Sequence, residues 1–275
     1  LLAGLILLSW LRAQGAAWPE RFHWFNAAIV GFLLLGIGNG GVNWAEQKVP
    51  SSLTALLIAV APLWFALLDW LRPGGRRPKL QTMLGILVGF AGMVMLVGTR
   101  EALRTNAIDP AGASALMLAS FAWAGGSLYA RYTPKPDPPL MGVALQMVVG
   151  GLMLLGLGVA CGEAANLGWE KISTRSAAAF FYLTIIGSLV GFTAYSWLLK
   201  VSTPARVSTY AYVNPVIAVF LGWAIAGEKL TSRILWAAAV IVLGVVIITS
   251  RSMARVKSSG IRDRRAAEGQ IARKN

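Results

Sequence analysis

Two short sets of polar side chains lie inside long apolar segments and could recognise a small solute. Asn39 and Asn43 are four residues apart. Ser208 and Tyr212 have the same spacing in a second segment, and Asn214 follows two residues later. Residues four apart share one face of a helix, so each set predicts a polar stripe. Such a stripe suits a small-molecule site, and we expect these five side chains to contact a substrate.

The same side chains also have a purely structural interpretation. An amide surrounded by lipid needs a partner, so the two asparagines must face protein or a water-filled cavity. Neighbouring backbone groups would satisfy them as well as a substrate would. Pro215 frees a carbonyl one turn earlier, and the adjacent amide of Asn214 could serve only to bond it.

Two aromatic residues, Trp123 and Tyr195, lie near the middle of their segments. Trp and Tyr usually anchor helix ends at the membrane surface, but these two residues lie far from the predicted ends. They could stack on an apolar or cationic substrate, or they could pack in the protein core.

Pro62 and Pro215 interrupt two other apolar segments. Proline kinks a helix, so both residues are candidate hinges for gating. Alternatively, the kinks are static and only shape a cavity.

The remaining reactive side chains are too few for an enzyme. The chain has one His and one Cys, which are His23 near a segment end and Cys161. An intramembrane enzyme would need a nucleophile with a base, or a metal cluster. We therefore expect no catalytic residue, no metal site and no cofactor, and an intramembrane enzyme is the alternative from another functional class.

The elements that carry these residues are predicted to be membrane-spanning helices. Of the 275 residues, 56% are hydrophobic and 13% are charged, against about 25% charged residues in soluble domains. A bilayer core about 30 Å thick needs roughly 20 apolar residues per helix. No Lys or Arg lies mid-membrane, and the acid inside a span, Asp69, is close to a helix end. The predicted spans are 24–44, 51–71, 80–98, 110–131, 139–161, 177–199, 204–226 and 231–250.

Another apolar run opens the chain at Leu1 and is too short to cross a membrane alone. It lacks an initiating Met and a charged n-region, so we interpret it as the end of a span and not as a signal peptide. Nine helices are then visible, and a tenth is expected before Leu1. The predicted fold is an all-α membrane protein, a ten-helix bundle whose first helix is missing from this sequence.

The distribution of positive charge predicts the orientation in the membrane. Eighteen of the 25 Lys and Arg residues fall in alternate connecting segments and in the tail after 250, and seven fall in the other segments. Cytoplasmic loops carry the excess of Lys and Arg, so the C-terminus is predicted to be cytoplasmic. The basic tail 251–275 is expected to lie against anionic lipid. The net charge of +14 thus indicates the lipid bilayer as a partner, and not nucleic acid.

The chain also matches itself, which predicts two repeats. The run from Leu2 matches 149–155 at a shift of 147 residues. Each copy lies five spans after the first, and an odd number of helices turns the second copy upside down. Inverted repeats allow a central cavity to open alternately to either side, although an ancient duplication without a transport role would leave the same pattern. A shift of 153 places Gly38 on Gly191, Trp44 on Trp197, Pro62 on Pro215 and Trp70 on Trp223.

A longer motif marks the second half. Pro204 opens a span, Asn214-Pro215 lies in its middle, Gly227-Glu228-Lys229-Leu230-Thr231 forms the next turn, and Gly244 lies in the last span. This pattern resembles the closing half of the EamA family of the drug/metabolite transporter superfamily. The first half departs from it, because Leu71-Arg72-Pro73-Gly74-Gly75 stands where the second half has Gly227-Glu228.

The resemblance implies a first repeat at 1–104, a second at 105–250 and the tail at 251–275. It implies export of amino acids, metabolites or drugs across the bacterial inner membrane, and the Trp-rich spans most resemble exporters of aromatic amino acids and paraquat. The lack of Arg or Lys at depth counts against phosphorylated substrates. The lack of a deep carboxylate favours facilitated diffusion, with a proton-coupled drug or organic-cation antiporter as the alternative. We expect a small-molecule substrate and no requirement for an oligomer.

Overall fold

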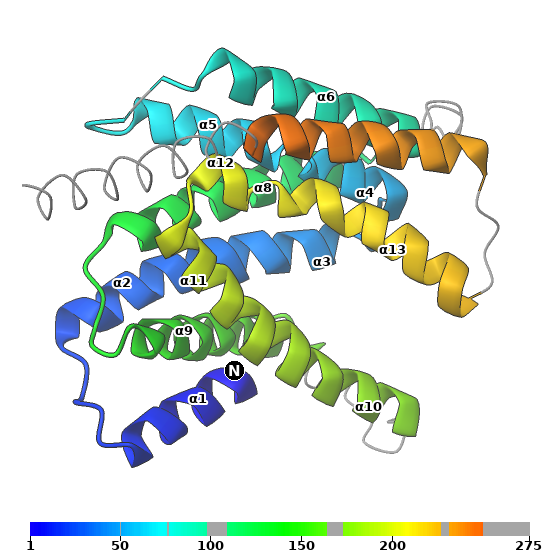
Figure 1. Cartoon of the computed structure of the whole chain (residues 1–275). Helices are drawn as coiled ribbons and strands as arrows, with labels where there is room; N and C mark the ends of the chain where they lie inside the picture. Colours follow the sequence, from blue (N-terminus) through cyan, green and yellow to red (C-terminus); the bar gives the residue numbers. More distant parts are fainter. Residues whose placement is uncertain (50, 76, 98–108, 164–172, 227–230, 250–275) are drawn as a thin grey trace, which may run out of the picture. The chain divides into compact units, whose positions relative to one another are not determined.

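A computed structural model describes residues 1–49, 51–75, 77–97, 109–163, 173–226 and 231–249 (Figure 1). Every regular element in these ranges is helical, which confirms the predicted all-α membrane fold. The tail 251–275 and the motif at 227–230 lie outside the described residues. Within the described part, six helices are long and apolar enough to cross a membrane: Arg21–Ala45, Thr54–Leu71, Pro110–Tyr132, Pro139–Ala160, Thr174–Val201 and Ser232–Thr249.

The chain divides into two compact units, Leu1–Arg76 with Arg100–Ser208 and Arg77–Thr99 with Thr209–Asn275. The second unit contains α6 (Leu80–Val97), α13 (Tyr210–Ala226) and the last described helix, Ser232–Thr249. The first unit contains α1 (Leu2–Ala13), α2 (Arg21–Gly31), η1 (Phe32–Gly40), α3 (Gly41–Ala45), α4 (Ser51–Ile58), α5 (Ala61–Leu71), α8 (Pro110–Tyr132), α9 (Pro139–Ala160), α10 (Thr174–Tyr182), η4 (Leu183–Phe192), α11 (Thr193–Val201) and α12 (Pro204–Val207).

Two spans of the first unit contain a π-helical segment. η1 covers nine residues and η4 covers ten. The π-helix is a rare, widened turn that is frequent at functional sites. At the repeat shift of 153 residues, η1 would fall on 185–193, which overlaps η4. The two spans paired by the predicted repeat thus both contain a π-helical segment, which includes Asn39 in the first span and ends three residues before Tyr195 in the second.

The two proline-containing spans are broken at different places. A turn at 59–60 separates α4 from α5, and Pro62 lies in the first turn of α5, where its missing N–H is tolerated. The span 204–226 was expected to be continuous, but it divides into α12 and α13 at 208–209. Pro215 lies inside α13, seven residues beyond the start of that break. A gating role for the two prolines stays a prediction.

Helices α1 and α9 lie side by side (Figure 1) and approach closely at two glycines. A Cβ on Gly4 would lie 2.7 Å from the backbone nitrogen of Val148, and a Cβ on Gly151 would lie 2.6 Å from the Cα of Leu1. Gly4 lies against Val148, whereas Leu1, which is earlier in the chain, lies against Gly151, which is later in α9. The two helices are therefore antiparallel. The contacts are also reciprocal, because a shift of 147 carries Gly4 onto Gly151 and Leu1 onto Val148. A local twofold axis produces contacts of this kind.

Helix α6 and the helix Ser232–Thr249 form reciprocal contacts in the second unit. A Cβ on Gly85 would lie 2.9 Å from the carbonyl oxygen of Gly244, and a Cβ on Gly92 would lie 3.2 Å from the carbonyl oxygen of Ala237. A shift of 152 carries Gly85 onto Ala237 and Gly92 onto Gly244. These two helices are therefore antiparallel as well, and their contacts are related by a second local twofold axis.

Two side-chain hydrogen bonds between α6 and the helix Ser232–Thr249 are also reciprocal, one at each end of the pair. Gln81 Nε2 donates to the carbonyl of Ile247 over 2.5 Å, and Arg233 Nε donates to the carbonyl of Met95 over 2.9 Å. The shift of 152 carries Gln81 onto Arg233 and Met95 onto Ile247. Equivalent bonds thus tie both ends of the pair, although the two donors are different residue types.

Candidate functional site

The two mid-span aromatic residues meet in the first unit. Trp123 Nε1 on α8 donates a 2.9 Å hydrogen bond to the hydroxyl of Tyr195 on α11, and the two ring centroids are 5.6 Å apart. Ser127 Oγ lies 2.6 Å from the Tyr195 hydroxyl and donates to the carbonyl of Trp123, also over 2.6 Å. The tyrosine hydroxyl therefore accepts from Trp123 and donates to Ser127, so all three polar groups are satisfied.

Further aromatic rings surround this chain of hydrogen bonds. Trp64 and Phe121 meet edge to face, with centroids 5.3 Å apart. Trp64 Nε1 is buried without a hydrogen-bond partner among the described residues. Because a buried unpaired donor costs about 1–3 kcal/mol, we expect a solute or a water molecule to accept this bond. Beneath the rings lies a buried cluster of Phe65, Ala124, Leu128, Leu199 and Val207, on which Trp64, Leu68, Trp123 and Tyr195 pack.

A cavity of about 440 Å³ lies between α5 and α8. Two of its lining residues are shared with the buried cluster on which these rings pack: Leu128 belongs to that cluster and Leu68 packs against it. Its volume falls in the range of small-molecule pockets, about 300–1,000 Å³. The other lining residues are Arg72, Pro73, Gly125, Tyr129, Tyr132 and Thr133.

A charged and aromatic group of residues lies at the end of this cavity. Arg72 Nε donates to Asp69 Oδ1 over 2.7 Å, and the Tyr132 hydroxyl donates to the same oxygen over 2.9 Å. The Arg72 guanidinium lies 3.9 Å from the centroid of the Tyr132 ring. The hydrogen bond to Asp69 raises the pKa of Arg72. The charge of Arg72 is thus already neutralised by Asp69 when a solute arrives.

The two asparagines of the first polar set lie on one span but outside this cluster. Asn39 is in η1 and Asn43 is in α3, and both side chains are exposed. Neither forms a hydrogen bond with another described residue, so neighbouring backbone groups do not satisfy them there. Their span contacts the aromatic pair at Gly38, where a Cβ would lie 3.0 Å from the Trp123 ring. Their role in binding stays a prediction.

The turn at 208–209 divides the second polar set between the two units, so its members are described separately. Ser208 is fully buried in the first unit and donates to the carbonyl of Ala205 over 3.0 Å. Tyr212 is fully buried in the second unit and donates to the carbonyl of Ile86 over 3.1 Å. Both side chains are buried in this conformation, whereas Asn214 is exposed, and a role of the three residues in binding stays a prediction.

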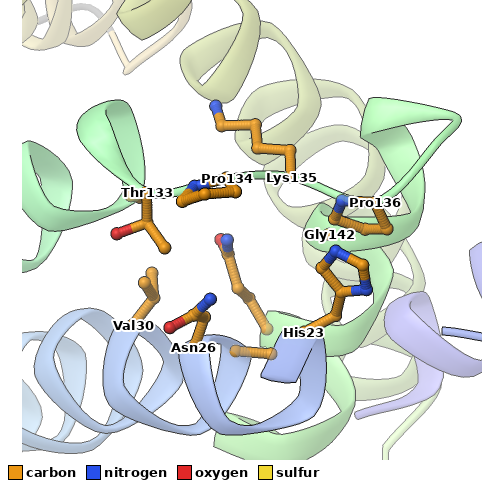
Figure 2. Close-up of a pocket in the computed structure, with 11 residues that line it drawn as sticks. His23, Asn26, Val30, Thr133, Pro134, Lys135, Pro136 and Gly142 are labelled. Carbon is orange, nitrogen blue, oxygen red and sulfur yellow. The ribbon is translucent and has the colours of Figure 1, made fainter. Parts of the chain in front are cut away.

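A second cavity, of about 20 Å³, lies between α2, α9 and the turn after α8 (Figure 2). Asn26 is 7% exposed, and its Oδ1 accepts a 2.7 Å hydrogen bond from Tyr129, while Nδ2 has no partner among the described residues. The cavity has room for one water molecule. Figure 2 shows His23, Asn26 and Thr133 around it, whereas the side chain of Lys135 leads away. We interpret this cavity as a buried water site.

Sequence reasoning missed two residues of the aromatic site. Ser127 lies four residues after Trp123, so the helical spacing rule could have found it. Trp64 stands in the first turn of α5, a position that depends on the turn at 59–60. Hydropathy does not reveal that turn, because residues on both sides are apolar.

The acidic and imidazole side chains of the described residues are dispersed. They form no group of three or more that could hold a metal ion. His23 Nδ1 accepts a 3.2 Å hydrogen bond from the backbone of Glu20, and Cys161 is an exposed free thiol. The aromatic residues offer ring faces and, at Trp64, one N–H donor that has no partner among the described residues.

Comparison with known proteins identifies the family. The EamA-like transporter family matches residues 1–98 and 110–250. The chain belongs to the EamA-like transporter family. This EamA-like transporter is 36% identical over 255 residues to the uncharacterized inner membrane transporter YedA of Escherichia coli K12, which covers 90% of this chain and 78% of that protein. It is also 24% identical over 253 residues to the protein PecM of Dickeya dadantii strain 3937, which covers 91% of this chain and 80% of PecM.

The fold of this EamA-like transporter also matches a solved structure. One crystal structure matches with a TM-score of 0.71 at 20% sequence identity, over 90% of this chain and 84% of that one. At this identity the likeness shows the fold alone. Together with the apolar helices, family membership makes the protein a multi-pass membrane transporter.

Proposed function

We propose that the protein exports aromatic and hydrophobic amino acids, with related metabolites or drugs, across the bacterial inner membrane by alternating access. The observation that carries the proposal is the unpartnered Nε1 of Trp64, in an aromatic cluster beside a cavity of about 440 Å³. The rings offer an apolar, polarisable surface for a side chain. The N–H group offers one directed donor for a carboxylate or carbonyl oxygen.

The charges near the cavity favour a neutral or zwitterionic solute. Arg72 is the basic residue that lines it, and its guanidinium is bound to Asp69. A phosphorylated substrate would require cations free to bind it. Asp69 is the acid inside the described spans, and it is held by Arg72 and Tyr132. Because proton-coupled carriers use a deep titratable carboxylate, we infer that the substrate moves down its own gradient.

Alternating access requires two halves of opposite orientation, and the helix contacts support that arrangement. The pair α1 and α9 and the pair α6 and Ser232–Thr249 each join one helix from either half. Both pairs are antiparallel, with reciprocal contacts. We therefore infer that the halves 1–104 and 105–250 are inverted repeats, and that the C-terminus is cytoplasmic.

A proteoliposome assay tests the proposed substrate and coupling together. Efflux of phenylalanine, leucine and a flat organic cation is measured with and without a pH gradient. We expect phenylalanine and leucine to move and the rates to be insensitive to the pH gradient. Movement of the cation alone, driven by the pH gradient, would support antiport and contradict the proposal. Absence of movement for all three would reject both.

Replacement of Trp64 by Phe tests the donor in the same assay. The substitution keeps an aromatic ring and removes the Nε1 hydrogen, so one substrate hydrogen bond worth about 0.5–1.5 kcal/mol is lost. We expect the KM for phenylalanine to rise about two- to tenfold. Trp236→Phe is the matched control, because Trp236 is 69% exposed. Equal KM values for both variants and the parent protein would remove Trp64 from the site.

A further inference from the structure

A third cavity, larger than the other two described above, opens on the first unit and shares no lining residue with the cavity between α5 and α8. It has a volume of about 710 Å³ and lies along α9 and the η4–α11 span. Both helices are long and apolar enough to cross a membrane, so a groove along them would be open to the acyl chains of a bilayer. The apolar walls consist of Pro139, Leu140, Val143, Leu189, Val190, Ala194 and Trp197, with the hydroxyls of Thr193 and Ser196 between them.

Two lysines line one end of this groove. Lys135 lies in the turn between α8 and α9, and Lys200 lies in the last turn of α11. Neither forms an ion pair or a side-chain hydrogen bond with another described residue. The nearby acid Asp137 is exposed and likewise unpaired among the described residues. Both ammonium groups are therefore free to bind a ligand.

The surroundings of Lys135 favour the arrival of an anion. Burial lowers the pKa of Lys135, and the charges of Lys200 and Arg131 lower it further. Arg131 itself donates to the carbonyls of Leu199 and Ser202 at the end of α11, so its guanidinium is already engaged. A negative group between the two lysines would relieve their mutual repulsion.

We propose that this groove binds an anionic phospholipid of the surrounding bilayer, with its phosphate between Lys135 and Lys200 and an acyl chain along α9 and α11. The positions of the groups match the parts of such a lipid, because the cations lie at the membrane surface and the apolar wall runs from them into the bilayer. Basic pockets between transmembrane helices bind lipid headgroups in this way. A free anion would use the lysines without the wall, and an uncharged lipid would use the wall without the lysines.

Native mass spectrometry of the purified protein, with added phosphatidylglycerol or phosphatidylcholine, tests this site. We expect phosphatidylglycerol to bind about tenfold more tightly. The double variant Lys135→Gln and Lys200→Gln should remove this preference. The charge-matched control, Lys48→Gln with Lys79→Gln, should keep it. Ala194→Trp fills the groove and leaves both lysines in place, so it should weaken binding of phosphatidylglycerol about as much as loss of the lysines.

Three results would overturn the proposal. The first is equal binding of the two lipids by the parent protein. The second is an equal loss of phosphatidylglycerol binding in the lysine double variant and in its charge-matched control. The third is displacement of phosphatidylglycerol by inorganic phosphate at the same concentration, since a free anion cannot occupy the apolar wall. Ala194→Trp keeps the test decisive if the lysine double variant does not fold.

Discussion

Replacement of Tyr195 by Phe is expected to lower transport about tenfold or more while the protein stays folded. The hydroxyl accepts a hydrogen bond from Trp123 and donates to Ser127. Without it, the buried N–H of Trp123 is unpaired, at a cost of about 1–3 kcal/mol, and each 1.4 kcal/mol corresponds to a factor of about ten in rate. We expect the indole to leave its orientation beside the cavity. Initial uptake rates in proteoliposomes at equal protein content measure the effect.

The control for this variant is Tyr182→Phe. Tyr182 is 62% exposed on α10, so loss of its hydroxyl should leave uptake unchanged. Ser127→Ala should reproduce part of the Tyr195→Phe defect, because it removes the acceptor for the tyrosine hydroxyl. Parental uptake by a folded Tyr195→Phe variant would show that the three hydrogen bonds only pack the core.

Replacement of Gly244 by Leu is expected to destabilise the protein by about 3 kcal/mol or more, or to prevent folding. A Cβ at this position would lie 2.5 Å from the backbone nitrogen of Gly89 and 2.8 Å from the carbonyl oxygen of Gly85. These are backbone atoms of the packed helix α6, so no side-chain rotation can make room. The unfolding midpoint of the detergent-solubilised variant, compared with that of the parent protein, measures the loss of stability.

The control for Gly244 is another helical glycine in an open position. A Cβ on Gly156 of α9 would meet no atom within 4 Å, so Gly156→Leu should unfold at the parental midpoint. Equal midpoints for the two variants would contradict the close contact between α6 and Ser232–Thr249. Because this contact is one half of a reciprocal pair, that result would also weaken the inference of inverted repeats.

The helical spans could be predicted from the sequence because the thickness of the bilayer sets their length. The predicted span 139–161 corresponds to α9 at Pro139–Ala160, and 80–98 corresponds to α6 at Leu80–Val97. Hydropathy reports where the chain is apolar, and it does not report where an apolar helix breaks. The break at 208–209 therefore could not be predicted, and with it the separation of Ser208 from Tyr212 was missed.

Two residues that lie at similar depth in their predicted spans meet in the structure. Trp123 and Tyr195 are aromatic residues far from the ends of their predicted spans, and the structure joins them by a hydrogen bond. Residues at one depth on neighbouring helices can meet, whatever the local helix geometry. The spacing of Ser208 and Tyr212 places them on one face only if the helix is continuous.

The reciprocal hydrogen bonds show a limit of sequence comparison. Gln81 and Arg233 occupy equivalent positions and donate to equivalent carbonyls. The two side chains share no charge and little shape, so aligning the halves by residue identity does not pair them. Both have a long side chain with an N–H donor near a helix end. The structure therefore pairs these two positions, whereas a comparison of residue types does not.

We expect the cavity between α5 and α8 to open to each side of the membrane in turn. Leu68→Cys, in a Cys161→Ser background, places one thiol on the cavity wall. A membrane-impermeant maleimide is applied to either face of oriented membranes, with and without phenylalanine. We expect the maleimide to label the thiol from both faces, and phenylalanine to slow the labelling from each. Labelling from one face alone under every condition would contradict it.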